Sequence, residues 1–231
     1  MCARYINIIM KSKYYEAYDN RYKTIHNKGY SWSSDKPTPI VLDVINRYQI
    51  SKQDKILEIG CGEGRDARLL LDNKYNLLAT DISKEAIRYC QNVMKEYKDS
   101  FMHLDCLNDN HEEKYKFIYA IALLHMLVLD DDRKRFYEFI YNHLDKEGIA
   151  LICSMGDGET IYQSDVNQAF DIVKREHPSG DVMVTSTSCR MVNFNTFVKE
   201  IEESNFEILE KGITSSLPDF NNLMYAVIKV K

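Results

Sequence analysis

The sequence lacks long apolar runs and clustered positive charge, and it contains only four prolines and one tryptophan. No apolar segment approaches the roughly 20 residues that a membrane-spanning helix needs, so no contact with a membrane is expected. The opening segment "MCARYINIIM" is too short and too weakly charged for a signal peptide. The formal net charge is −5, and without a basic stripe to contact phosphates a nucleic-acid partner is not expected.

The cysteines do not show the paired spacing of a metal site. They are scattered along the chain and lie mostly within apolar segments: Cys2, Cys61, Cys90, Cys106, Cys153 and Cys189. We therefore expect reduced thiols in the core, no bound metal and a cytoplasmic location. The length of 231 residues suits one α/β domain spanning 1–231, and two full domains would be cramped.

From Lys55 onward, short apolar runs alternate with helical patterns, which is typical of a parallel sheet with crossover helices. Helices are expected after Ser83, which is placed to cap one, over roughly 131–144, and from about Asn195. The last two strands are expected to form an antiparallel hairpin. The pattern predicts an α/β fold with a Rossmann-like, seven-stranded, mostly parallel sheet and helices on both faces. The expected strands are 55–59, 76–80, 100–104, 116–123, 148–154, 206–213 and 223–230.

Two segments fall outside this alternation. Residues 1–48 are expected to form an N-terminal helical flap, which is rich in aromatic residues and ends in a helix begun at Pro37 or Pro39. Residues 155–192 are long and polar with patchy helix or strand character, too long for a plain connection, so we expect a lid or substrate loop. Positive charge in the flap either attracts an anionic substrate or forms a solvated face. Its residues are Lys11, Lys13, Arg21, Lys23 and Lys28.

The stretch "ILEIGCGEGR" (56–65) places glycines at every second position behind an acidic residue. Gly60 and Gly62 allow the backbone to pass close to a ligand, and Gly64 allows the next helix to begin tightly. A dinucleotide fingerprint would need its third glycine three residues after the second, where Arg65 stands. This disfavours a nicotinamide-dependent oxidoreductase.

Acidic residues end two neighbouring strands. Asp81 ends the second, where a carboxylate is able to accept hydrogen bonds from both hydroxyls of a ribose. Asp105 ends the third, where its side chain or backbone is able to meet an adenine edge. Together with the glycine turn they indicate a nucleoside-containing cofactor. The alternative is a tight turn beside two solvated aspartates.

This pattern resembles the class I S-adenosylmethionine-dependent methyltransferases, from about Lys55 to Lys231. The resemblance implies S-adenosylmethionine as cofactor and S-adenosylhomocysteine as product. It implies that Asp81 holds the ribose and that Asp105 with Cys106 lies along the adenine, and that "AIALLHML" (120–127) flanks the methionine part and the substrate. The implied cofactor site comprises Glu58, Gly60, Cys61, Gly62 and Gly64 in the methionine-side loop, with Asp81, Ile82, Asp105, Cys106 and Ala120.

Residues 18–45 are similar to the entry segment of the thiopurine, thiol and halide methyltransferases and of the tellurite-resistance methyltransferases. The shared features are an aromatic-x-x-Arg-aromatic stretch, Gly29, Trp32 and the following prolines. This likeness implies a small, soft nucleophile. Tyr18 and Tyr22 are then expected at the substrate and Trp32 at the cofactor, as an aromatic flap; the alternative is ordinary packing of an N-terminal helix.

Methyl transfer from a sulfonium is an in-line displacement that depends mainly on holding the reactants collinear in a dry site. His125 follows the fourth strand and is expected to act as a base or orienting group, or else to be a hydrogen-bonded structural histidine. Arg190 is expected to pair with a substrate anion or to lie on the surface. We expect a small-molecule methyltransferase, monomeric or homodimeric. A protein or RNA methyltransferase, or a cofactor-binding domain without catalysis, remains the alternative.

Overall fold

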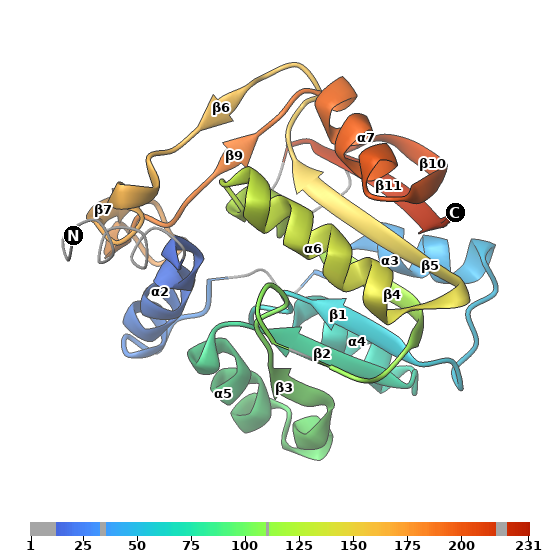
Figure 1. The fold of residues 1–231 in the computed structure, drawn as a ribbon. Coiled ribbons are helices and arrows are strands. Elements are labelled where there is room, and N and C mark those ends of the chain that lie inside the picture. Colours follow the sequence, from blue (N-terminus) through green and yellow to red (C-terminus); the bar gives the residue numbers. More distant parts are fainter. Residues whose placement is uncertain (1–12, 33–35, 110, 216–220) are drawn as a thin grey trace, which may run out of the picture.

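A seven-stranded sheet runs through the centre of the computed structural model, which describes residues 13–32, 36–109, 111–215 and 221–231 (Figure 1). The strand order is β10-β11-β5-β4-β1-β2-β3. All seven predicted strands are present, and β5 begins earlier than expected. Their bounds are β1 Ile56–Ile59, β2 Leu77–Asp81, β3 Phe101–His103, β4 Tyr115–Ile121, β5 Leu144–Met155, β10 Phe206–Thr214 and β11 Leu223–Val230.

The sheet is parallel at its centre and antiparallel at one end. Strand β1 pairs in parallel with β2 and β4, and the parallel ladder continues to β3 and β5. Strand β11 is antiparallel to both β5 and β10. The predicted C-terminal hairpin and the predicted Rossmann-like fold class are therefore confirmed.

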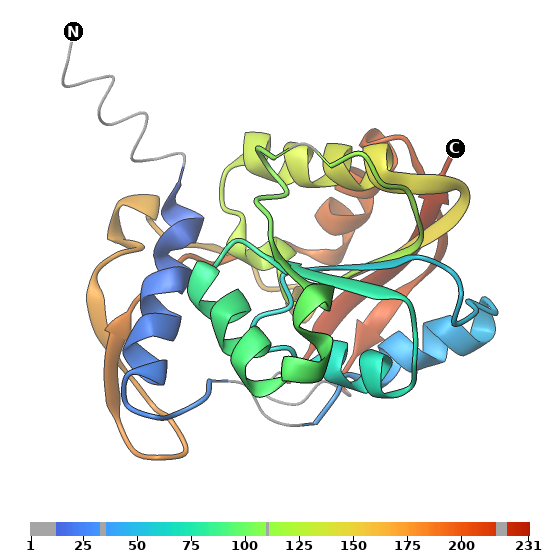
Figure 2. The same cartoon turned by 90° about the horizontal axis from the view of Figure 1, so that it is seen from below.

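Helices cover both faces of the sheet, as the side views show (Figures 1 and 2). Helices α6 (Asp130–His143) and α7 (Phe194–Glu203) cover one face, and α3 (Pro39–Arg47), α4 (Arg65–Asp72) and α5 (Lys84–Val93) cover the other. In β4 the side chains alternate between the two cores, since Phe117 packs with the second helix group and Ile118 with the first. This alternation is what a strand buried on both faces requires.

Local signals in the sequence set where these helices begin. The Ser83 hydroxyl caps α5 by accepting a hydrogen bond from Ala86 N at 3.0 Å, as predicted. Asn193 caps α7 in the same way, accepting from Thr196 N at 2.8 Å. Helix α3 begins at Pro39, the second of the two prolines expected to start it.

The N-terminal segment and the long insertion meet at one end of the sheet. The segment forms η1 (Tyr14–Glu16) and α2 (Ala17–His26), and residues 1–12 of the predicted flap lie outside the described residues. The insertion contains β6 (Tyr162–Gln163), η4 (Val166–Gln168), β7 (Ile172–Arg175), β8 (Val182–Thr185) and β9 (Arg190–Met191), in which β7 pairs with β8 and β6 with β9. Both views place α2 beside the β7–β8 hairpin (Figures 1 and 2).

The connections at the other strand ends are short. They include η2 (Lys95–Ser100) before β3 and η3 (Leu124–Met126) after β4. Across the part of the chain that the structure describes, no helix is both long and apolar enough to cross a bilayer.

Candidate functional site

The glycine turn after β1 adopts backbone conformations that only glycine takes readily. Gly60 has a φ of +78° and Gly62 a φ of +53°. A β-carbon at Gly60 would lie 2.3 Å from Leu123 Cδ1, and one at Gly62 would lie 2.7 Å from the Tyr22 hydroxyl. The turn therefore requires glycine both for its conformation and for the close approach of its neighbours.

Asp81 at the end of β2 holds this turn in place. Its Oδ2 accepts a hydrogen bond from Gly62 N at 2.8 Å, and its Oδ1 accepts one from Ser83 N at 2.7 Å. The carboxylate is only 8% exposed, and this burial raises its pKa above the ordinary value. Each oxygen keeps a lone pair that is able to accept a further hydrogen bond from a ligand.

A cavity opens beyond the carboxyl ends of β1 to β4, as expected for this class of sheet. It encloses about 650 Å³ of empty space, and we call it the inner cavity. Most of the predicted adenosine-side residues line it. The lining residues are Tyr15, Tyr18, Tyr22, Ile59, Gly60, Asp81, Ile82, Leu104, Asp105, Cys106, Leu107, Ala122, Leu123, Met126 and Leu127.

Asp105 anchors the far end of the inner cavity. Its Oδ1 accepts from Leu107 N at 3.0 Å and its Oδ2 accepts from the Asn108 side chain at 2.8 Å. The Tyr15 hydroxyl lies 3.5 Å from Asp105 Oδ2 and accepts a hydrogen bond from the same Asn108 amide. No motif in the sequence points to Tyr15 itself, although it belongs to the aromatic segment that is expected to cover the site.

A second, larger hollow continues from the first toward the insertion, and we call it the outer chamber. It encloses about 1860 Å³ of empty space, which includes its opening to solvent. Tyr18, Tyr22, Gly60, Ala122 and Met126 line both hollows, so the two are continuous. The other walls of the chamber are Arg21, Trp32, Glu58, Gly62, Glu63, Arg65, Asp66, Ile121, His125, Met155, Tyr162, Ser164, Arg175, Ser186, Thr187, Ser188, Cys189 and Met191.

Glu58 is a buried carboxylate in the chamber wall with an unfilled bonding position. It is 3% exposed, and its Oε2 has no hydrogen-bond partner in the structure. Burial, reinforced by the nearby charge of Asp66, raises its pKa well above the ordinary value. A buried acceptor without a partner is costly, so this position suits a cationic or donating group of a ligand.

Known proteins share this fold and part of this sequence. Residues 57–150 match the family model described as a methyltransferase domain. The glycopeptide N-methyltransferase MtfA superimposes with a TM-score of 0.65 at 15% identity, covering 84% of this chain and 90% of that chain. A 1,6-didemethyltoxoflavin-N1-methyltransferase from Burkholderia thailandensis gives a TM-score of 0.66 at 12% identity, covering 90% of this chain and 85% of that chain. The protein has the class I methyltransferase fold.

Curated proteins match the sequence of this chain over less than half of its length. The chain is 28% identical over 95 residues to the ribosomal RNA small subunit methyltransferase A of Clostridium botulinum (strain Okra / Type B1), which is 41% of this chain and 34% of that protein. It is 31% identical over 84 residues to the protein of that name in Mycoplasmopsis synoviae (strain 53), covering 36% of this chain and 32% of that protein. The chain thus spans about a third of the length of these curated relatives. MtfA has been crystallised with S-adenosylmethionine and with S-adenosylhomocysteine.

His125 lies in η3, after β4, and lines the outer chamber. It is 3% exposed, and its Nδ1 accepts a hydrogen bond from Met155 N at 3.4 Å. Burial, with a smaller contribution from the positive charge of Arg133, lowers the pKa of His125 to about 3. The imidazole is therefore neutral near pH 7 and is a weak base, so an orienting role suits it better than proton abstraction.

This pKa predicts a pH dependence of stability. Below pH 6.5 the unfolded chain protonates His125, whereas the folded protein does not until about pH 3. The free energy of unfolding should then fall with decreasing pH across this window, by at most about 1.4 kcal/mol per pH unit from this group. We expect His125→Gln to flatten that slope in urea unfolding measured from pH 4 to 7. His103→Gln changes an exposed histidine and serves as the control. If His125→Gln leaves the slope unchanged, the lowered pKa of His125 is contradicted.

Trp32 and His26 fasten the N-terminal segment to the glycine turn. Trp32 N donates to both carboxylate oxygens of Glu63 at 2.8 Å. The ring nitrogens of His26 lie 2.8 Å from Glu63 Oε1 and 2.8 Å from Glu85 Oε1. Burial alone would lower the pKa of His26, but the hydrogen bonds to the two glutamates raise it above the ordinary value. The flap is thus held to the turn by a charged contact rather than by apolar packing alone.

Arg190 does not occupy the position expected for a substrate contact. Its Nη1 donates to Val128 O at 2.8 Å and to Asp130 Oδ1 at 2.6 Å, and it lines neither hollow. Three other predicted cofactor residues also line neither hollow: Cys61, Gly64 and Ala120. Cys61 and Ala120 are buried, and Gly64 packs against Met94 and Cys90. The remaining predicted site residues line one hollow or both.

Arg21 is a site residue whose position the charge pattern did not predict. The flap charge was thought to form a solvated face or to attract an anion, and the solvated alternative is wrong for Arg21, which is 5% exposed. Its Nε donates to Thr185 O at 3.0 Å, and a second donor of the same guanidinium bonds Ser186 O. The aromatic-x-x-Arg-aromatic stretch was the available signal.

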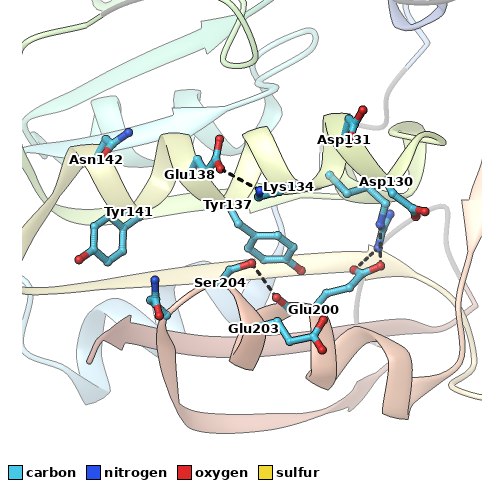
Figure 3. Close-up of a pocket in the computed structure, with 12 residues that line it drawn as sticks. Asp130, Asp131, Lys134, Tyr137, Glu138, Tyr141, Asn142, Glu200, Glu203 and Ser204 are labelled. Carbon is cyan, nitrogen blue, oxygen red and sulfur yellow. Dashed lines mark hydrogen bonds and ion pairs between the residues drawn. The ribbon is translucent and has the colours of Figure 1, made fainter.

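A separate hollow lies between α6 and α7 (Figure 3), and none of its lining residues lines the inner cavity or the outer chamber. Arg133 and Glu200 form a two-pronged ion pair there, with contacts of 2.9 and 2.6 Å. Lys134 and Glu138 form a second ion pair, with a single contact of 3.8 Å, along the exposed side of α6. Arg133 also donates to Leu124 O at 2.8 Å, which supports η3 and His125 from behind. The central charges of this hollow are thus paired within the protein.

Proposed function

We propose that the protein transfers the methyl group of S-adenosylmethionine to a small-molecule nucleophile bound in the outer chamber. The observation that carries the proposal is the continuity of the two hollows beneath α2 and the insertion. A small acceptor in the chamber would lie next to whatever occupies the inner cavity. The neighbours that act on glycopeptides and on 1,6-didemethyltoxoflavin support acceptors of this general size.

The residues present fit this cofactor. Asp105 and Cys106 would lie along the adenine, and Asp81 would accept hydrogen bonds from the ribose hydroxyls. The unfilled Glu58 Oε2 would accept a hydrogen bond from the amino group of the methionine part. When bound, the cofactor supplies an electrophilic methyl group. These assignments leave each buried carboxylate with a donor.

The protein's own contribution is to orient the acceptor and exclude water. Tyr18, Tyr22 and Trp32 bring aromatic surface to the chamber, and the insertion closes the other side. His125 is neutral and is placed to accept or donate one hydrogen bond to the acceptor. Because the neutral His125 is only a weak base, we expect a nucleophile that reacts with little help, such as a thiol or an amine. This agrees with the resemblance to thiol-type methyltransferases, which stays a prediction.

A ribosomal RNA methyltransferase is the second candidate, since the curated relatives carry that description. Against it, the chain has no basic stripe and no Asn-Pro-Pro-Tyr type signature after β4. A cofactor-binding domain without catalysis is a third. Both remain outcomes of the test below.

Calorimetry and a methylation assay test the proposal together. S-Adenosylhomocysteine should bind with one site per chain, and NAD should not bind. Labelled S-adenosylmethionine should then transfer its methyl group to members of a panel of small thiols, amines and phenols. Methylation of naked ribosomal RNA but of no panel member would favour the second candidate. Binding of NAD in place of S-adenosylhomocysteine would reject the cofactor.

A further inference from the structure

We infer that the acceptor carries an anionic group, and that Arg21 of α2 and Arg175 of β7 bind this group in the outer chamber. The inference rests on the proposed function and names the chemical class of its substrate. It assigns substrate selection to the N-terminal flap and the insertion rather than to the sheet.

The guanidinium of Arg21 is buried but only partly satisfied. An arginine carries five N–H donors, and Arg21 uses two of them, on the carbonyl oxygens of Thr185 and Ser186. Both acceptors are neutral, and among the described residues no carboxylate forms an ion pair with Arg21. Because the side chain forms part of the chamber wall, its remaining donors are available to a ligand there. A buried cation without a counter-charge strongly favours an anion.

Arg175 places a second positive charge in the same wall. It is the last residue of β7 in the insertion, it lines the chamber, and it is exposed. No hydrogen bond or ion pair engages it among the described residues. Its charge acts on Arg21, since burial first and Arg175 among the nearby charges lower the pKa of Arg21. Two uncompensated guanidinium groups on one side of a chamber repel each other until an anion lies between them.

Among the described residues, none of the acidic side chains of the chamber forms an ion pair with Arg21 or Arg175, and two of these acids bond other partners at the glycine turn. Glu63 accepts hydrogen bonds from Trp32 N and His26. Asp66 accepts from Thr38 N at 2.6 Å and from Arg65 at 3.2 Å. Glu63 and Asp66 thus lie at the glycine turn, where a cationic cofactor is proposed, whereas Arg21 is directed toward the insertion and Arg175 belongs to it. Such a separation would orient an acceptor with its anionic group away from the methyl donor.

Aromatic rings frame the arginine pair. The Arg21 guanidinium lies 5.1 Å from the centre of the Tyr18 ring and 5.0 Å from the Trp32 ring. These cation–π contacts, with the two hydrogen bonds to carbonyl oxygens, restrict the guanidinium, so that its remaining donors are pre-oriented for an anion such as a carboxylate. The hydroxyls of Ser186 and Thr187 lie in the same wall and are able to complete the contact. The fitting ligand is therefore a small, partly apolar molecule with a carboxylate or similar anion.

Trp32 provides a direct probe of this charge, because it is the only tryptophan and lies against Arg21. In protein saturated with S-adenosylhomocysteine, we expect the ratio of iodide to caesium quenching constants of Trp32 to exceed that of free N-acetyltryptophanamide at least about twofold at equal ionic strength. Arg175→Gln should lower the iodide quenching constant by about half and leave quenching by neutral acrylamide unchanged. Arg68→Gln removes an equal charge on the exposed side of α4, outside the lining of the chamber, and should change neither.

A ligand pair tests the same site by binding. We expect benzoate to bind the S-adenosylhomocysteine-loaded protein at least about tenfold more tightly than benzamide, with Arg175→Gln removing that preference and Arg68→Gln keeping it. Equal affinities, binding of neither compound, or an iodide-to-caesium quenching ratio no greater than that of N-acetyltryptophanamide would overturn the inference. Normal S-adenosylhomocysteine binding in all three proteins keeps this failure distinct from failure of the proposed function. Arg175→Gln is preferred to a change at Arg21, which also joins α2 to the insertion.

Discussion

Replacing Asp81 with alanine is expected to weaken binding of S-adenosylhomocysteine at least about hundredfold. The carboxylate has two functions that the variant would lose together. It fixes the glycine turn through Gly62 N and, in the proposed site, accepts hydrogen bonds from the ribose hydroxyls. A hydrogen bond to a charged group contributes about 1.5–3 kcal/mol, and each 1.4 kcal/mol corresponds to a factor of about ten in affinity.

Two further variants make this measurement decisive. Asp81→Asn keeps one acceptor oxygen but turns an amide toward one of the two backbone donors, so its affinity should lie between those of the alanine variant and the parent. Asp99→Ala removes an exposed carboxylate in η2 and should bind normally. Calorimetry at one ionic strength gives all four constants. If Asp81→Ala stays folded and binds like the parent, Asp81 has no part in holding the cofactor.

Replacing Tyr14 with alanine is expected to cost about 3–5 kcal/mol of unfolding free energy, the range for deleting a large buried aromatic side chain. Tyr14 is 0% exposed, and its hydroxyl accepts hydrogen bonds from Val128 N at 2.6 Å and Leu129 N at 3.2 Å. The variant would leave a cavity in the core between the sheet and α6 and would strip two backbone donors of their acceptor. For a chain of this length the melting temperature should fall by roughly 6–20 °C.

The control for Tyr14 comes from the same N-terminal segment. Tyr30 is 37% exposed, and Tyr30→Ala should change the unfolding free energy by less than about 0.5 kcal/mol. Tyr14→Phe removes the hydroxyl alone and should cost about 1–3 kcal/mol. Urea unfolding followed by circular dichroism measures all three variants. Equal, small losses at Tyr14 and Tyr30 would mean that the segment opens independently of the sheet.

Tyr14 bears on the two alternatives for the aromatic segment. Tyr14 and Tyr15 belong to the main core cluster, and Tyr15 also lines the inner cavity, so this part of the segment is packed in the core and reaches the site at Tyr15. Tyr18, Tyr22 and Trp32 line the hollows, so the following part covers the site. The segment therefore serves both as core packing and as a cover over the hollows, and the packing of Tyr14 positions the residues that cover them.

The sequence by itself determined the sheet and the glycine turn, because both follow from short-range rules. Strands buried on both faces are continuous apolar runs, and their order along the chain with crossover helices leaves few topologies. The positive φ values of Gly60 and Gly62 favour glycine for local steric reasons, whatever the rest of the chain contributes. Asp81 and Asp105 were predictable for the same reason, since Asp81 is the last residue of β2 and Asp105 follows β3 by two residues.

Only the tertiary structure decided the environment of the charged and titratable groups. Arg21 bonds a carbonyl 164 residues away in the sequence, and Arg190 is drawn to Asp130 and away from the chamber. His125 was expected to act as a base or to be structural, and its burial beside Arg133 makes it a weak base. Burial and partner charges come from segments that the chain brings together only on folding. For this reason the sequence located the proposed cofactor site, whereas the proposed charge selectivity of the chamber depends on the packing of α2 against β8.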